Sequence, residues 1–306
     1  RCQPMNASPL TNRRNLDFML YELLGVDRLC EYPRFADHSR DTFGAALDLA
    51  HQIALEKFLP HNRKSDLNEP HMVDGKVVLI PEIGEAVQVY NDAGFAAALA
   101  EYEAGGMQLP FVIAQACDSM FSAANPGTIA YPALARGVSN LLQSYGTPEQ
   151  KRLYMQPIIE GRYFGTMCLS EPHAGSSLAD IKTTAEPQAD GSYRLTGAKM
   201  WISAGDHELG ENIIHLVLAK IVGAPAGVRG ISLFVVPRWK VNADGTRGAR
   251  NDVRLAGLNH KMGQRGSVNT FLKFGEAGDC DAFLVGEPHQ GLVAMFHMMN
   301  EERIGV

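Results

Sequence analysis

Apolar residues recur with the period of an α-helix from Asn15 to about Gly161. One stripe consists of Leu16, Met19, Leu20 and Leu23, and a second of Ala46, Leu49, Ala50 and Ile53. The same spacing predicts helix over 82–103 and 128–145. Thr147 can cap a further helix, because Pro148 suits its first turn and Gln150 can complete a capping box. Gly161 is expected to end it. The N-terminal half is therefore predicted to be all-α.

From about Gly165 to Val285 the pattern changes to short β-rich runs. These runs are 193–196, 199–203, 214–221, 231–236 and 268–274. Asp190-Gly191 and Ala243-Asp244-Gly245 are turn sequences between them. Short strands without intervening helices favour an antiparallel sandwich or barrel over a dinucleotide-binding sheet.

The last segment, Gly291 to Val306, returns to helical spacing, with Leu292, Met295, Phe296 and Met299 on one predicted face. It carries no terminating signal, so we expect the helix to continue into further chain. The fold class is predicted as α+β and multidomain. The predicted parts are an N-terminal helical extension (1–80), an α-helical domain (81–164), a β-domain (165–286) and the start of a C-terminal helical domain (287–306).

Composition narrows the function classes. The chain has 306 residues, 45% hydrophobic, 20% charged and a net charge of −6. That charge argues against nucleic acid as a partner, since DNA and RNA attract basic surfaces. No apolar run approaches the ~20 residues of a membrane helix, and Arg1–Pro4 does not resemble a signal peptide. We therefore expect a cytoplasmic protein. The five scattered cysteines predict neither a disulfide framework nor a metal site.

The sequence lacks the motifs of several common enzyme classes. No glycine-rich dinucleotide or phosphate-binding loop, no nucleophile elbow and no zinc-protease motif is present. What remains is the segment 165–177, GTMCLSEPHAGSS, followed by 199–203, KMWIS. The first reads as a strand that leads into a loop with small hydroxyl residues. In the second, strand alternation places Trp201 and Ser203 on one face.

A flat aromatic surface beside a hydroxyl donor suits a planar heteroaromatic ring with a polar edge. Each segment alone is also consistent with a purely structural role, because a tryptophan on a strand is usually part of the core and the loop could be only a turn. The two segments together, in this order, resemble the acyl-CoA dehydrogenase family. That family carries C-[L/V]-[T/S]-E-P-x-A-G-S and then K-M-W-I-[T/S] in its middle β-domain.

Other segments extend the resemblance over about Asp92 to Val306: YGTPEQK (145–151), GISLFVVP (230–237), HKMGQRGS (260–267) and NEER (300–303). The segment from Leu16 to Pro81 looks like the extra N-terminal region of larger bacterial members, such as the group around 3-methylmercaptopropionyl-CoA dehydrogenase. The resemblance implies an FAD-dependent oxidoreductase of fatty acid metabolism that oxidises an acyl-CoA to the 2-enoyl-CoA.

The resemblance also implies roles for single residues. Met167, Leu169 and Ser170 would contact the pyrimidine edge of the flavin, Trp201 would pack against the isoalloxazine, Ile202 would belong to the same site, and the Ser203 hydroxyl would reach N5. Ser176 matches a position near coenzyme A, and Asn300 and Arg303 match a segment that lines the substrate channel. The family's catalytic glutamate would lie beyond Val306. Glu171 belongs to the loop frame and is not assigned that role.

The implied partners are an acyl-CoA substrate, an electron-transferring flavoprotein as acceptor, and copies of the chain in a homodimer or homotetramer. Residues 1–306 alone are expected to hold FAD weakly and to be inactive. His173 and Ser177 depart from the usual Gly and Asp of the family, which weakens any inference about acyl chain length. Two alternatives stay open: an acyl-CoA oxidase of the same fold, and a flavin-containing relative that binds DNA without catalysis.

Overall fold

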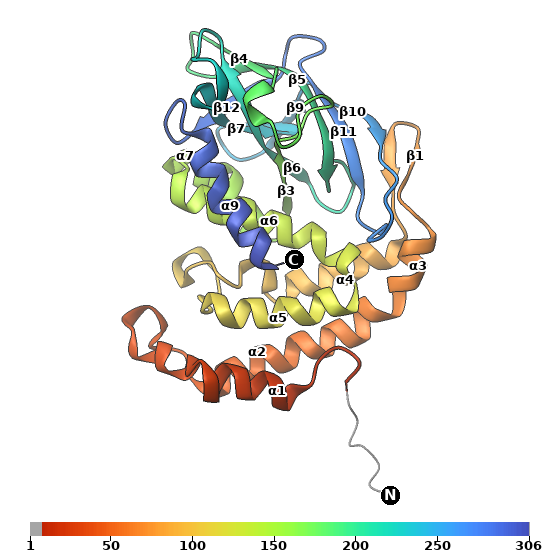
Figure 1. Ribbon diagram of the computed structural model, residues 1–306, viewed down its shortest axis with the longest axis vertical. Coiled ribbons are helices and arrows are strands. Elements are labelled where there is room, and N and C mark those ends of the chain that lie inside the picture. The colour runs from red at the N-terminus through yellow and green to blue at the C-terminus, as the bar shows by residue number, and fades with distance from the viewer. Residues whose placement is uncertain (1–7, 306) are drawn as a thin grey trace, which may run out of the picture.

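The computed structural model describes residues 8–305 (Figure 1). Arg1–Pro4, considered above for a leader, lies outside the described residues. The α-helices are α1 (Arg13–Asp17), α2 (Arg40–Ile53), α3 (Asn62–Leu67), α4 (Pro81–Asp92), α5 (Phe111–Ala124), α6 (Pro126–Tyr145), α7 (Pro148–Gln150), α8 (Gln156–Ile159) and α9 (Gly291–Gly305). π-Helical turns are η1 (Phe18–Leu23), η4 (Ala54–Phe58) and η8 (Lys151–Met155). Short 3₁₀ turns are η2 (Val26–Glu31), η3 (Pro33–Phe35), η5 (Leu59–His61), η6 (Phe95–Ala97), η7 (Tyr102–Ala104), η9 (Leu178–Asp180) and η10 (Gly227–Gly230).

Apart from one early hairpin, the strands lie between α8 and α9 along the chain. They are β1 (His71–Val73), β2 (Lys76–Val78), β3 (Tyr163–Cys168), β4 (Thr184–Pro187), β5 (Tyr193–Ser203), β6 (Asn212–Ile221), β7 (Ile231–Pro237), β8 (Trp239–Val241), β9 (Arg247–Arg250), β10 (Val253–Leu258), β11 (Asn269–Phe274) and β12 (Asp281–Val285). Among residues 8–305, no helix is both long and apolar enough for a membrane span.

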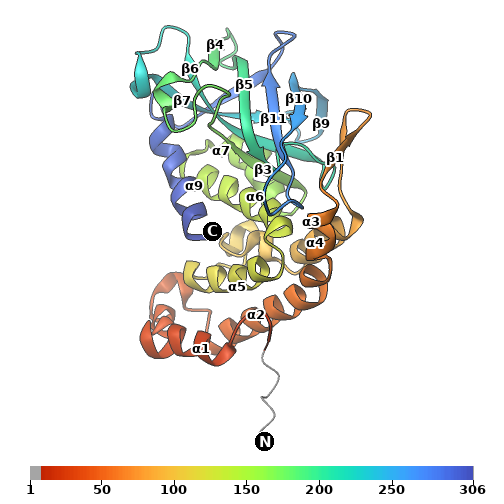
Figure 2. The same cartoon turned by 45° about the vertical axis from the view of Figure 1, so that its right-hand side comes forward.

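The N-terminal helices form a layer at one end of the molecule, and α6 lies between this layer and the strands (Figures 1 and 2). α2 packs on α5, and α6 packs on both α5 and β3. The centre of the helical layer is aromatic: Phe43, Phe58, Tyr90, Phe95 and Phe121 are all buried there. The predicted helical character of the N-terminal part is thus confirmed, apart from the β1–β2 hairpin that interrupts it.

The predicted helix over 82–103 is too long. α4 ends at Asp92 and Gly94 adopts φ +84° in the left-handed region, where a residue with a Cβ is disfavoured. By contrast, the predicted capping box is present, because the Thr147 hydroxyl accepts from the Gln150 amide at 3.2 Å. Asp74-Gly75 forms an early hairpin that we did not predict. Both residues have positive φ, as a tight two-residue turn requires.

The β-part is a small barrel with extra strands. β5 pairs with β12, β12 with β7, β7 with β6, β6 with β4 and β4 with β5, which closes a ring of strands. β11 and β10 extend the sheet from β5, and β3 extends it from β6. The predicted antiparallel barrel is confirmed, although β3 and β4 run parallel to β6. Its interior is apolar, with Leu195, Val217, Phe234 and Phe274 among the buried residues.

α9 packs across α6 and β7 and returns the chain to the helical layer. Its orientation is set at its first residue, because a Cβ on Gly291 would meet the Ser232 carbonyl carbon at 2.2 Å. The buried face consists of Ala294, Met295 and Met298. The predicted apolar face is therefore rotated, and Phe296 is 40% exposed.

Candidate functional site between the barrel and the helices

Two segments that are some thirty residues apart in sequence lie side by side at the start of the site. The Met200 amide donates to the Ser170 carbonyl at 2.9 Å. The Lys199 ammonium donates to the Leu169 carbonyl at 3.0 Å. The loop that follows β3 is therefore held along the carboxyl half of β5, and Ser170 lies beside the KMWIS segment.

Glu171 fixes this loop. Its carboxylate accepts from Lys199 Nζ at 2.9 Å, from the Thr183 amide at 3.0 Å and hydroxyl at 2.6 Å, and from the Lys182 amide at 2.7 Å. Burial favours the protonated form, but Lys199 and these hydrogen bonds outweigh it and hold the pKa of Glu171 below its usual value. A carboxylate so fully engaged is a structural anchor. This agrees with its expected place in the loop frame.

Trp201 occupies a β-bulge. Ile202 pairs with Thr270 and Lys199 pairs with Leu272, so Met200 and Trp201 together oppose a single residue of β11. Trp201 has φ +64°, which is unusual for a bulky residue, and its side chain is 60% exposed. Strand alternation therefore does not govern this position, contrary to our same-face argument for Trp201 and Ser203. The bulge presents a large aromatic surface outward rather than to the barrel core.

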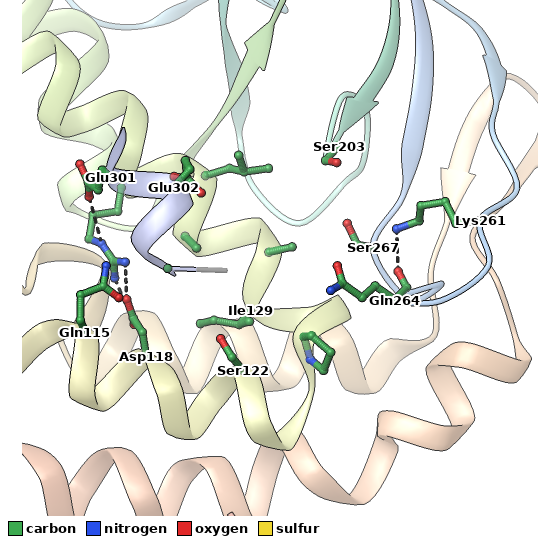
Figure 3. A pocket seen from close by; sticks show the side chains of 16 residues that line it. Gln115, Asp118, Ser122, Ile129, Ser203, Lys261, Gln264, Ser267, Glu301 and Glu302 are labelled. Carbon is green, nitrogen blue, oxygen red and sulfur yellow. Dashed lines mark hydrogen bonds and ion pairs between the residues drawn. The ribbon is translucent and has the colours of Figure 1, made fainter. Parts of the chain in front are cut away.

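Ser203, at the end of β5, lines a cavity of about 280 Å³ (Figure 3). The Ser203 oxygen accepts from the Asn269 amide at 3.4 Å, so its own proton is available to a ligand. Lys261, Gln264 and Ser267 from the chain before β11 lie on the same side. Burial lowers the pKa of Lys261, whose ammonium donates to the Gln264 carbonyl at 2.6 Å. Apolar residues of α6, including Ile129, Ala130 and Ala133, form the middle of the wall.

The opposite end of the cavity is charged. Arg136 of α6 forms a buried two-point ion pair with Asp118 of α5, and its Nη1 also donates to the Tyr90 hydroxyl at 3.1 Å. Glu301 and Glu302 of α9 complete this end. Burial raises the pKa of Glu302 to about 7, with Arg136 opposing this shift and Glu301 adding to it.

Comparison with known sequences identifies the family. Residues 45–162 match the sequence model of the acyl-CoA dehydrogenase N-terminal domain, and residues 166–276 match that of the middle domain. The chain is 35% identical over 290 residues to 3-methylmercaptopropionyl-CoA dehydrogenase of Ruegeria pomeroyi, which covers 93% of this chain. It is 34% identical over 305 residues to a butyryl-CoA dehydrogenase of Syntrophomonas wolfei, which covers 96% of this chain. The chain belongs to the acyl-CoA dehydrogenase family.

Solved structures show the same fold. A butyryl-CoA dehydrogenase of Megasphaera elsdenii superposes with a TM-score of 0.69 at 22% identity, over 88% of this chain and 64% of that one. An acyl-CoA dehydrogenase of Bacillus anthracis complexed with FAD gives a TM-score of 0.70 at 22% identity, over 88% and 42% of the two chains. The chain spans about half the length of the curated relatives, 49% and 50% of the two named above.

The site residues expected from acyl-CoA dehydrogenases are only partly brought together. Ser170 lies beside β5, and Ser203 faces the cavity. The Ile202 side chain is buried in the barrel core, which leaves only its backbone for a cofactor. Ser176 is exposed on the loop after β3. Asn300 and Arg303 lie on an exposed face of α9 and are not among the cavity's lining residues, so their substrate role stays a prediction.

Sequence reasoning gave no role to three of the charged residues that line the cavity, Lys261, Glu302 and Arg136. Lys261 stands in the HKMG segment that carried the resemblance, but we gave it no role. Glu302 stands between two residues that we did consider. Its helical register could have shown that it faces away from Asn300 and Arg303. Arg136 could not have been found, because its importance comes from Asp118, a residue of another helix.

Proposed function

We propose that this chain is part of an FAD-dependent acyl-CoA dehydrogenase that converts an acyl-CoA thioester into the 2-enoyl-CoA. The observation that carries the proposal is the junction of the two motif segments, where the Met200 amide meets the Ser170 carbonyl at 2.9 Å beside a cavity that Ser203 lines. This arrangement offers a ring-sized aromatic surface, a hydroxyl donor and a volume for an acyl group within one region.

The residues present fit a flavin. The exposed Trp201 indole gives a flat surface for the ring, and the Ser170 hydroxyl lies on the neighbouring loop. Among residues 8–305 the Ser203 hydroxyl oxygen only accepts a hydrogen bond, from the Asn269 side-chain amide. Its proton can therefore be donated to a ligand. Backbone groups of Met167 and Leu169 and of Ile202 complete the proposed contact set. A bound flavin supplies the hydride acceptor, N5.

In this proposal Ser203 donates a hydrogen bond to the group that receives negative charge with the hydride. Such a donor accelerates the reaction because its bond strengthens as the charge develops. The Lys199–Glu171 pair holds the loop and the bulge in register, so the donor is positioned before the substrate arrives. The α-proton is removed by a carboxylate that the resemblance places beyond Val306.

The proposal extends to the surroundings of the site. Ser176 contacts the coenzyme A part of the substrate, and Asn300 and Arg303 line the substrate channel once α9 is covered. The protein works in the cytoplasm as a homodimer or homotetramer and passes electrons to an electron-transferring flavoprotein. Comparing dye-linked turnover with oxygen consumption separates this enzyme from an oxidase.

The test uses the longest natural polypeptide that contains this sequence, purified and loaded with FAD. Anaerobic addition of butanoyl-, hexanoyl- or octanoyl-CoA should bleach the flavin's visible absorbance and yield the matching 2-enoyl-CoA. A protein that binds FAD stoichiometrically, yet is bleached by no acyl-CoA of a broad panel, would contradict the proposal. Ser203→Ala should retain FAD but be bleached more slowly.

A further inference from the structure

The side of the cavity opposite α9 is formed by the loop of residues 260–267 between β10 and β11, which we call the cavity loop. Lys261, Gln264 and Ser267 of this loop line the cavity, and they lie across it from the two glutamates of α9 (Figure 3). Gln264 has φ +52°, in the left-handed region that residues with a Cβ rarely adopt. Such a conformation persists only where the surrounding contacts hold it. The position of this wall therefore depends on what packs behind the loop.

α3 and the residues that follow it hold the cavity loop by polar contacts. The Arg265 amide donates to the Asp66 carboxylate at 3.0 Å. The Glu69 carboxylate lies 2.9 Å from His260 Nδ1 and 3.3 Å from a guanidinium nitrogen of Arg265. Burial lowers the pKa of Lys261, and Glu69 and Asp66 oppose this shift, so both acids also act on a residue of the cavity wall. These contacts draw the loop toward α3.

Direct packing limits how closely the loop approaches α3. A Cβ on Gly266 would lie 2.8 Å from Ser65 Oγ and 2.9 Å from Ser65 Cβ, and Ser65 is only 1% exposed. On the other side, the Tyr131 hydroxyl of α6 donates to the Gly266 carbonyl at 3.0 Å and accepts from the Val268 amide at 2.9 Å. The cavity loop is therefore held between α3 and α6, in contact with both.

We propose that α3 determines the length of the acyl chain that the cavity accepts, with Ser65 and Asp66 as positioning residues that act through the cavity loop. The inference rests on the proposed function. The loop lies between α3 and the cavity, so a wider gap between α3 and the loop moves the wall into the space for the acyl chain. Within residues 8–305, neither Ser65 nor Asp66 lines the cavity, so both act only through the loop. One methylene group in an apolar pocket changes kcat/KM by about tenfold or more, so a small shift of the wall is measurable.

The experiment measures chain-length preference in the longest natural polypeptide, loaded with FAD. The readout is the ratio of kcat/KM for the longest to that for the shortest acyl-CoA, from butanoyl to octanoyl, that bleaches the wild-type flavin. Gly266→Ala should lower this ratio by about tenfold, because the new Cβ pushes the loop away from α3. A ratio between two substrates does not depend on how much of the variant folds. Adding Ser65→Gly should restore the wild-type ratio, because it removes both atoms that the Cβ meets within 3 Å.

Asp66 gives an independent variant pair. Asp66→Ala should lower the same ratio, because the loop loses the acceptor that draws it toward α3. Asp66→Asn keeps an acceptor oxygen for the Arg265 amide and should keep the wild-type ratio. The control is Arg63→Ala, which removes an exposed side chain of the same helix and should leave the ratio unchanged.

The outcomes separate this inference from the proposed function. An unchanged ratio in Gly266→Ala, or a lowered ratio that Ser65→Gly does not restore, overturns the inference and leaves the dehydrogenase proposal intact. A wild-type protein that binds FAD but is bleached by no acyl-CoA from butanoyl to octanoyl instead contradicts the proposed function.

Discussion

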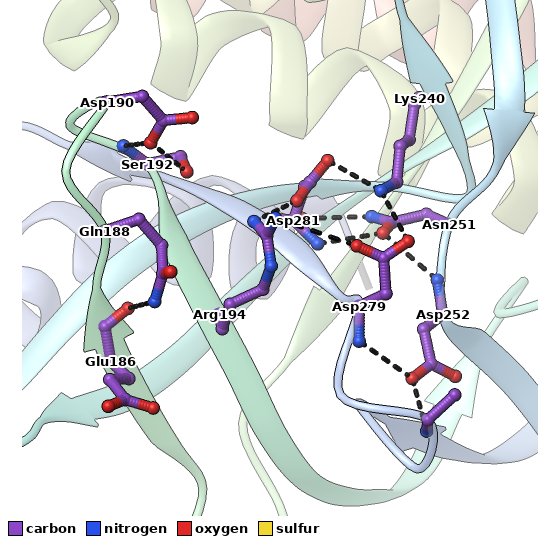
Figure 4. A network of polar contacts seen from close by, with 11 residues as sticks. Glu186, Gln188, Asp190, Ser192, Arg194, Lys240, Asn251, Asp252, Asp279 and Asp281 are labelled. Carbon is purple, nitrogen blue, oxygen red and sulfur yellow. Dashed lines mark hydrogen bonds and ion pairs between the residues drawn. The ribbon is translucent and has the colours of Figure 1, made fainter.

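The two ends of β5 use charge in opposite ways. Near its carboxyl end, Lys199 is fully buried and pairs with Glu171, whose side chain is 3% exposed. Near its amino end, Arg194 joins Asp279, Asp281 and Lys240 in a wider network (Figure 4). The members of that network are partly exposed, up to 63% for Asp279. The carboxyl end therefore has a single buried ion pair, and the amino end has several ion pairs that are exposed to solvent.

The difference shows which end of β5 is held in a fixed geometry by its ion pairs. Water screens the Arg194 network, so each pair there contributes little and can be replaced by its neighbours. Lys199 is the buried cation at Glu171, whereas the exposed His173 ring lies 3.7 Å from that carboxylate, so loss of Lys199 or Glu171 leaves a buried charge without a close partner. The buried pair stands next to Trp201 and Ser203, whereas the exposed network only joins β5, β8 and β12. We therefore expect substitutions at the two ends to differ sharply in their effect on the free energy of unfolding.

The largest effect is expected from Lys199→Met. This change leaves the Glu171 carboxylate buried without its cation and should lower the free energy of unfolding by about 3–5 kcal/mol. Denaturant unfolding measures it. The exposed Lys182→Met is the matched control and should change stability by no more than about 0.5 kcal/mol. Equal losses in both variants would show that the buried pair with Glu171 contributes no more to stability than an exposed lysine does.

Ser203→Ala should have the next largest effect, on rate rather than on stability. Loss of one donor aimed at developing charge slows such reactions by about 10²–10³-fold. Stopped-flow bleaching of the flavin by an acyl-CoA measures this rate. Ser144→Ala, which removes an exposed hydroxyl of α6 outside the cavity, serves as the control. A Ser203→Ala protein that is bleached at the normal rate would place the hydride acceptor elsewhere.

Through Glu302, the free energy of unfolding of the protein should depend on pH. Burial raises its pKa to about 7, so the folded state binds its proton more tightly than the unfolded state does. The contribution of Glu302 to the free energy of unfolding is fully present below the pKa of the unfolded state, about 4.3. It falls by roughly 2–3 kcal/mol as the pH rises toward 7. Glu302→Gln should therefore gain stability relative to the wild type between pH 5 and pH 8. A stability difference between Glu302→Gln and the wild type that does not change over this pH range would contradict the burial of Glu302.

The smallest effect is expected from Arg194→Gln. The partly exposed network should lose about 0–1 kcal/mol, and added salt should shrink the difference further. Thermal unfolding at low and high ionic strength measures both. A loss as large as that of Lys199→Met would show that exposure does not separate the two ends of β5.

Much of the architecture was readable from local signals. The capping box at Thr147 and the turn at Asp190-Gly191 are short-range chemistry, and both are present. The end of α4 at Asp92 was missed because apolar spacing continues past Gly94. The Trp201 bulge was missed because it depends on the register of β11, which no spacing within β5 reports.

The site divides in the same way. Ser170 and Ser203 could be singled out from the sequence because each lies in a contiguous motif, and the structure places Ser170 beside β5 and Ser203 in the cavity wall. The Glu171–Lys199 pair was missed although both residues lie in those motifs, since their contact is made only when β3 and β5 fold together. The charged end of the cavity joins α5, α6 and α9, three helices whose packing the sequence does not state.

The central claim is that a flavin ring lies against the exposed bulge at Trp201. Residues 1–306 contain two tryptophans, Trp201 and Trp239, and the emission of each is obtained as the difference between the unsubstituted protein and its Phe variant. In the longest polypeptide, binding of FAD should quench nearly all of the emission that Trp201→Phe removes. It should quench a clearly smaller share of the emission that Trp239→Phe removes. Stoichiometric FAD binding that quenches Trp239 as much as Trp201, or more, would contradict the account.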